Sequence, residues 1–185
     1  MPTPVSHAAV GYAIASWARA DTETRRLGIV AAACAALPDI DWPWNVATTS
    51  LFSHRAITHS LLFAALSAVL ATCLCFTRSQ RSTNGRTILL ILGLAALSHA
   101  CLDALSSYSY GIEFFAPFWR QRFRFVWTPL GDPSGTLAGQ LRQELFVVFL
   151  PAVVLATVGL WVRRTRRGRF EPDHPGSSRH TGLGL

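Results

Sequence analysis

Histidine and aspartate residues occur inside or at the ends of apolar segments, where ionisable groups are rare. His99 and Asp103 are four residues apart within one such segment. On a helix this spacing puts both side chains on one face, which is a common way to direct two ligands at one metal ion. Ionisable groups in or beside a membrane are energetically unfavourable and by default mark functional sites. The pair therefore predicts a functional site.

Two further groups of this kind precede the pair. His54 and His59 are five residues apart, and they converge only if a helix begins near His59. Asp39 and Asp41 follow Pro38, and in an extended segment both carboxylates would face one direction. The alternative for the two aspartates is that they cap a following turn.

This combination of side chains has a defined chemistry. Neutral imidazole together with carboxylate suits zinc, manganese or iron. A divalent ion lowers the pKa of a bound water and makes a nucleophile near neutral pH. A carboxylate that is not coordinated could act as general base, a role open to Asp39 and Asp41. Arg55 lies between His54 and His59 and is the best candidate for contact with an anion.

Other polar residues have a plain structural interpretation beside a functional one. His7 opens the first apolar segment as either a helix-end residue or a metal ligand. Ser60 is interpreted as a helix-start hydroxyl rather than a nucleophile. Glu144 is favoured at a helix start by the helix dipole, with membership of the site as the alternative. His174 and His180 are assigned no role.

The elements that must position these residues are apolar. Half of the residues are hydrophobic and 15% are charged, whereas a soluble domain carries about 25% charged residues. Ala- and Leu-rich segments without alternation predict helices. They cover about residues 5–17, 27–37, 61–76, 87–105 and 144–162.

A membrane crossing takes about 20 apolar residues, which the last two segments reach and the third nearly reaches. The first two are either a packed helical hairpin or spans lengthened by buried polar residues. We therefore expect an all-α bundle with four or five membrane-embedded helices. Residues 1–170 are predicted to form one membrane-embedded domain, and residues 171–185 a disordered cytoplasmic tail, because the tail is rich in Gly, Ser, Pro and His.

The net charge of +7 comes from arginines that cluster in short loops, as expected for positive-inside topology. No nucleic-acid motif accompanies them, so a nucleic-acid partner is not expected. The basic loops lie between the first and second segments, between the third and fourth, and after the fifth. If all five segments cross, these loops are cytoplasmic, and the His and Asp residues gather at the extracytoplasmic ends.

The loop over residues 106–142 interleaves aromatic residues with arginines. Such residues at a bilayer edge usually anchor a protein at the headgroups. A substrate lip, in which Arg120, Arg122 and Arg124 hold a phosphate or carboxylate, is the alternative.

Several motifs together resemble the YdjM-like, membrane-bound metal-dependent hydrolases. They are His7, Leu37-Pro38-Asp39-Ile40-Asp41, His54-Arg55-x-x-Thr58-His59-Ser60, His99-x-x-x-Asp103 and Phe115-Ala116-Pro117-Phe118. Members of that family are described as inner-membrane proteins, and some are linked to the LexA-controlled DNA-damage response. The resemblance covers roughly residues 7–124.

The resemblance implies a metal-dependent hydrolase at the bacterial inner membrane. It implies seven candidate ligands: His7, Asp39, Asp41, His54, His59, His99 and Asp103. Seven is too many for one tetrahedral ion, so either two metals bind or some of the seven orient the others. Zinc is the expected ion, and a lipid or lipid-linked ester or phosphoester is the expected substrate. A transporter and a metal-stapled structural or regulatory membrane protein remain as alternatives.

Overall fold

The computed structural model describes residues 2–19, 22–44, 51–107, 110–131 and 135–168. Within these ranges the chain is helical, with two isolated β-bridges and no β-strand. The all-α class is therefore confirmed. The predicted tail, residues 171–185, lies outside the described residues.

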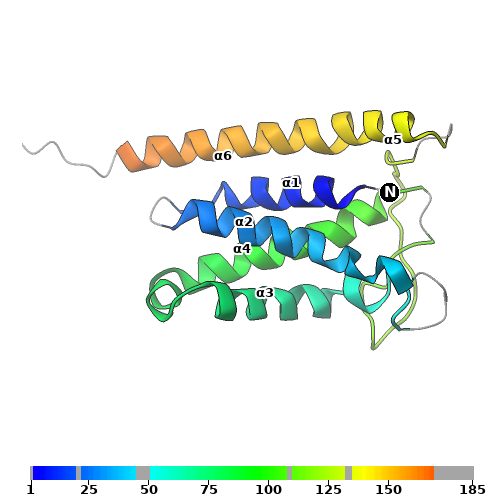
Figure 1. Ribbon diagram of the computed structural model, residues 1–185, viewed down its shortest axis with the longest axis horizontal. Helices are drawn as coiled ribbons and strands as arrows, with labels where there is room; N and C mark the ends of the chain where they lie inside the picture. The colour runs from blue at the N-terminus through cyan, green and yellow to red at the C-terminus, as the bar shows by residue number, and fades with distance from the viewer. Residues whose placement is uncertain (1, 20–21, 45–50, 108–109, 132–134, 169–185) are drawn as a thin grey trace, which may run out of the picture.

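Four helices form a bundle, and a fifth rod lies along one side of it (Figure 1). The bundle consists of α1 (Pro4–Ala15), α2 (Thr24–Ala36), α3 (Leu61–Cys75) and α4 (Arg78–Ala104). The outer rod runs through α5 (Leu137–Glu144), the π-helical turn η3 (Leu145–Phe149) and α6 (Leu150–Gly168). It packs against α1, whereas α3 packs against α4 on the opposite side of the bundle.

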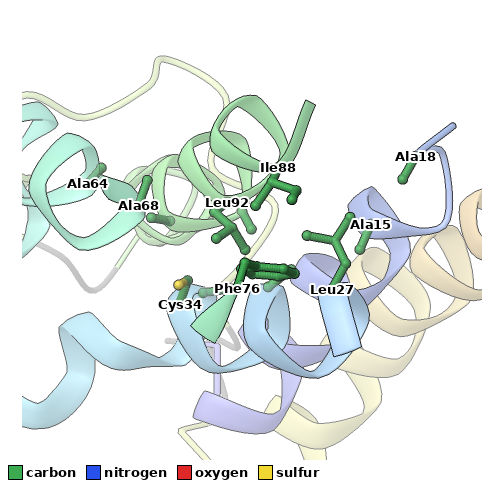
Figure 2. Packing of buried hydrophobic residues seen from close by; sticks show 13 residues of the cluster. Ala15, Ala18, Leu27, Cys34, Ala64, Ala68, Phe76, Ile88 and Leu92 are labelled. Carbon is green, nitrogen blue, oxygen red and sulfur yellow. The ribbon is translucent and has the colours of Figure 1, made fainter. Parts of the chain in front are cut away.

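The bundle interior is built mainly from small residues around a few large ones. Figure 2 shows Phe76 among Leu27, Ile88 and Leu92, all of which are buried. Alanines of α1, α2 and α4 fill the remaining interface and let the helix backbones approach closely, as is typical of helices packed in membranes.

Two glycines mark a close approach of α1 and α2. A Cβ atom added at Gly11 would lie 2.5 Å from the carbonyl oxygen of Ala31, so only glycine fits there. Gly28 of α2 receives the ring of Tyr12 in the same way. These two contacts fix how α1 and α2 lie against each other. The start of α1 and the end of α2 thereby lie at the same end of the bundle.

Two helices are longer than the apolar segments predict. α4 begins at Arg78 rather than near Thr87, because Thr77 and Gln80 form a capping box at its start. Arg78, Arg81 and Arg86 are therefore helical and do not form a loop. The last rod begins at Leu137 rather than Glu144, because the Thr136 hydroxyl accepts a hydrogen bond from the Gly139 amide.

Two stretches are long and apolar enough to cross a membrane, Arg78–Ala104 and Leu137–Arg166. α3 is apolar but has 15 residues, and α1 and α2 have 12 and 13. At about 1.5 Å per residue, these three are shorter than a hydrocarbon layer of about 30 Å. Two candidate spans are thus present among the described residues, and the predicted four or five remain a prediction.

Candidate metal centre

The sequence-predicted residues meet at one end of the bundle, where the N-terminus of α1, the end of α2 and the end of α4 lie together (Figure 1). Each element has a local reason to begin or end there. The Thr3 side chain caps α1, and Pro4 occupies its first turn. Pro38 has no backbone N–H to donate, and after α2 the chain continues as the 3-10 segment η1 (Leu37–Trp44). Ser60 caps α3.

The first group of side chains consists of Asp39, His59, His99 and Asp103. One ligand atom from each lies within 4.8 Å of all the others. His99 Nε2 is 3.0 Å from His59 Nε2 and 3.5 Å from Asp39 Oδ1. Atoms bound to one ion at about 2.1 Å stand about 3.0–3.4 Å apart, so these separations fit a shared ion.

His7 adjoins this group from α1. Its ring stacks on that of His99 with centroids 3.8 Å apart, and its Nε2 lies 3.5 Å from Asp103 Oδ1. His7, His99 and Asp103 are fully buried. The i, i+4 spacing on α4 therefore does direct both side chains to one place, and His7 reaches the same place from another helix.

The second group consists of Asp41, His54 and His59. Asp41 Oδ1 is 2.5 Å from His54 Nδ1, and Asp41 Oδ2 is 3.5 Å from His59 Nδ1. Asp41 also accepts hydrogen bonds from the Thr58 hydroxyl and the Arg55 backbone amide. The two groups share His59, whose opposite ring nitrogens face them.

The shared histidine suggests how the seven candidates divide. A histidine that binds a metal through one nitrogen commonly donates its other N–H to a carboxylate or a carbonyl. His59 Nδ1 faces Asp41, and His99 Nδ1 donates to the Ala35 carbonyl oxygen at 2.7 Å. Both arrangements direct Nε2 into the first group. Asp41 is thereby placed to orient histidines.

Buried atoms without a hydrogen-bond partner test whether a metal ion fits the first group and the adjoining His7. Within the described residues, both Asp39 carboxylate oxygens and both His7 ring nitrogens are buried without a hydrogen-bond partner. Buried polar atoms of this kind are expected to be satisfied, and a bound ion is one way to do so. The donor set of imidazoles and carboxylates therefore fits a divalent metal.

The two carboxyl groups of η1 have opposite pKa shifts. Burial raises the pKa of Asp39 above its ordinary value. Burial also acts on Asp41, but hydrogen bonds from His54, His59 and Thr58 outweigh it and hold the pKa of Asp41 below its usual range. Asp41 is therefore a stable acceptor for the histidines around it.

Arg55 turns its side chain into the cluster. Its Nε lies 3.1 Å from Asp103 Oδ2, and the residue is 7% exposed. Its backbone has a φ of 68°, a region that non-glycine residues rarely adopt and that often marks functional sites. A positive charge is thus held beside the predicted ligands.

The arginine-rich loop is held by its own contacts. Arg120 and Arg122 form ion pairs with the buried Glu113, and Arg124 donates to the Ser107 carbonyl oxygen. The Glu113 amide donates to the Arg55 carbonyl oxygen, which ties this loop to the cluster. These contacts favour a structural role for the loop arginines over the substrate-lip alternative.

Thr58 belongs to the motif that carries the family resemblance, and its hydroxyl lies 3.0 Å from His59 Nδ1. Two positioning contacts could not be read from the sequence. The Ala35 carbonyl has no side-chain signal. Glu144 neither starts a helix nor enters the cluster. Its carboxylate accepts hydrogen bonds from the Thr3 amide and hydroxyl and from the Ser6 hydroxyl, so it fastens the last rod to the start of α1.

Comparison with known proteins supplies the family. The family described as YdjM inner membrane protein matches residues 1–167. Inner membrane protein YbcI of Escherichia coli (strain K12) is 29% identical over 175 residues, which cover 89% of this chain and 100% of that protein. No solved structure matches the chain. The family match spans all the residues of the cluster, and the chain belongs to the YdjM inner membrane protein family.

Proposed function

We propose that the protein is a membrane-bound metal-dependent hydrolase that acts on an ester or phosphoester of a membrane-associated substrate. The observation that carries this proposal is the convergence of Asp39, His59, His99 and Asp103, with buried unpaired atoms on Asp39. These four residues would hold the ion, with His7 as a fifth ligand. Zinc suits the donor set best, with manganese or iron as alternatives.

The chain's own residues have separate tasks in this proposal. A divalent ion in the site would supply an activated water as nucleophile. Asp39 either ligates the ion or accepts the proton of that water, since its oxygens have no competing hydrogen bond within the described residues. Asp41 orients His54 and His59, and Arg55 steadies the negative charge that develops on the substrate.

A metal staple without catalysis is the second candidate. The ligands come from α1, η1, η2 (Ile57–His59) and α4, so one ion would join four segments of the chain. Transport is less well supported, because a path needs polar residues deep along several helices, whereas these residues gather near the ends of their helices.

Metal analysis combined with an activity screen separates the two candidates. The purified protein is tested for bound metal and for hydrolysis of phosphoesters and lipid esters in detergent, beside His99→Ala and Asp39→Ala. His174→Ala is the matched control, because it removes an imidazole that has no assigned role. We expect His99→Ala to lose metal and turnover, and the control to keep both.

The outcomes are distinct. Loss of turnover in a stable, metal-loaded Asp39→Ala protein supports the hydrolase with Asp39 as base. A parent protein without hydrolytic activity, whose two variants lose both metal and stability, supports the staple. A parent protein that binds no metal contradicts both candidates.

A further inference from the structure

The segment between α4 and α5 exposes large apolar side chains at the end of the bundle that holds the metal centre (Figure 1). Five of the ten residues 118–127 are of this kind: Phe118, Trp119, Phe125, Val126 and Trp127. Phe118 is 86% exposed, and Val126 is fully exposed. Single exposed apolar residues are ordinary, whereas a group of them marks an interaction surface. These five residues are called the aromatic edge.

The backbone beneath the aromatic edge is fixed by hydrogen bonds. Ile112 and Phe123 exchange both of their backbone hydrogen bonds, at 2.8 and 2.9 Å. The Phe125 amide donates to the carbonyl oxygen of Ala104, at the end of α4. A cluster of rings with centroids 5.4, 5.5 and 5.7 Å apart supports the first part of the edge and consists of Phe115, Trp119 and Phe123. An ordered segment therefore presents the exposed side chains.

The charges of this segment are directed away from the aromatic edge. Arg120 and Arg122 form ion pairs with the buried Glu113, and Arg124 donates to the Ser107 carbonyl oxygen. The five residues of the edge are themselves phenylalanine, tryptophan and valine, which carry no charge. We therefore expect the partner of the edge to be recognised by apolar contact and not by ionic attraction.

The position of the segment in the chain indicates which partner it meets. Two stretches able to cross a membrane flank it, Arg78–Ala104 before it and Leu137–Arg166 after it. A segment that joins the ends of two such stretches lies at a membrane surface. Exposed apolar side chains resume at the start of the last rod, at Leu137 and Leu141. Lipid would cover both surfaces, whereas a separate protein partner would explain only the edge.

We propose that the aromatic edge inserts into the interfacial layer of the membrane leaflet on the side of the metal centre. Tryptophan is enriched at this depth, because its ring is apolar and its indole N–H can still reach water or headgroups. Contact is made by the rings and by Val126, so the edge takes zwitterionic and anionic lipids alike. The proposal does not depend on hydrolysis or on a bound metal.

Insertion of the edge would set the depth of the metal centre. The Glu113 amide donates to the Arg55 carbonyl oxygen, and the Leu61 amide donates to the Phe114 carbonyl oxygen. The segment is thereby bonded on both sides of η2, which carries His59. A centre held in this way would lie at the level of the lipid headgroups.

Tryptophan quenching in reconstituted vesicles tests the proposal. The full chain and the double variant Trp119→Phe/Trp127→Phe are placed in phosphatidylcholine vesicles, and the difference between their emissions reports the two tryptophans of the edge. Phosphatidylcholine brominated on its acyl chains quenches from within the membrane, and acrylamide quenches from water. Trp161→Phe is the reference, because Trp161 is exposed within a candidate span.

We expect brominated lipid to remove most of the difference emission, as it does for Trp161, and acrylamide to remove little of it. Failure of brominated lipid to quench overturns the proposal. Quenching by acrylamide in that case places the edge in water, and protection from acrylamide places another protein on it. Melting temperatures of the variants, compared with that of the parent, show that the fold is retained.

Vesicles of different charge separate apolar insertion from ionic attraction. The same measurement is made in phosphatidylcholine and in phosphatidylglycerol. We expect equal quenching of the difference emission by the brominated form of each lipid. Quenching in phosphatidylglycerol alone would show that charge holds the segment at the membrane and would overturn the assignment to the aromatic edge.

Discussion

At the scale of single residues, Asp41 contacts His59, the histidine that the two groups of the candidate metal centre share. Asp41 Oδ1 contacts His54 Nδ1, and Asp41 Oδ2 faces His59 Nδ1. Oδ2 also accepts a hydrogen bond from the Thr58 hydroxyl. A carboxylate in this position fixes the orientation of imidazoles, so that a small error in its placement propagates to the ligand atoms.

Replacing Asp41 by asparagine should therefore weaken metal binding without abolishing it. Outer partners of this kind change metal affinity by about 10–100-fold when they are removed. A competition titration with a chromogenic chelator measures the affinity of Asp41→Asn and of Asp39→Asn. Equal affinity in Asp41→Asn and the parent would contradict the orienting role. A greater loss of affinity in Asp39→Asn identifies Asp39 as a ligand, whereas unchanged affinity in that variant leaves it as the base.

Much of the site is predictable at this scale. The i, i+4 spacing of His99 and Asp103 needs only helix geometry, and burial of both follows from the apolar segment around them. The partner of His99 Nδ1 is a backbone carbonyl, which any residue type supplies. Its identity depends on how α2 packs against α4, and spacing within one helix carries no information about that.

At the scale of elements, Glu144 joins the last rod to the start of α1. Its carboxylate is 2% exposed and accepts three hydrogen bonds from Thr3 and Ser6, next to His7. Sequence reasoning assigned Glu144 to the start of its own helix, since a single helix dipole offers that explanation. The Glu144 carboxylate instead accepts hydrogen bonds at the start of α1.

Glu144→Gln should lower thermal stability, because a neutral amide replaces an ionised acceptor. Hydrogen bonds to charged groups contribute about 1.5–3 kcal/mol each, so we expect a clear drop in melting temperature in detergent. Arg142→Gln, an exposed change in the same helix, is the control. If Glu144→Gln has the same melting temperature as the parent, the inference that Glu144 stabilises the packing of α1 is wrong.

The α1–α2 contact gives a second prediction for elements. Gly11→Ala should destabilise the protein by about 1–3 kcal/mol, because the new methyl would overlap Ala31. Gly93→Ala is a matched control, since its methyl would lie 3.9 Å from Ala68 Cβ, and alanine favours helix. Unfolding in denaturant should separate the two, and similar stability for both would contradict the tight contact.

At the scale of the whole molecule, a bound ion would join α1, η1, η2 and α4. Removal of metal by a chelator should lower the melting temperature, and restored zinc should recover it, because a ligand that binds only the folded state stabilises it. The His99→Ala variant provides the comparison and should show no response to chelator. If chelator also leaves the melting temperature of the parent protein unchanged, the candidate metal centre is contradicted.

Orientation in the membrane is the second prediction at this scale. Reporter fusions after Arg81 and after Arg167 should both read cytoplasmic, because the basic ends of the helices lie there under positive-inside topology. The candidate metal centre would then face the extracytoplasmic side. A periplasmic result at either fusion would break this arrangement.

The overall class follows from composition, while the number of crossings does not. Leu137–Arg166 is recognisable from its length and apolar content alone. α1 and α2 are short and rich in alanine, and such helices suit either a buried hairpin or a crossing. Their role depends on how closely they pack through Gly11 and Gly28, which composition does not report.

The order of the ligands along the chain has a consequence for biosynthesis. His7 is made early, yet its partners His99 and Asp103 belong to α4 and emerge from the ribosome much later. A nascent chain halted before α4 would therefore carry only part of the ligand set, and metal loading would wait until that helix has been inserted.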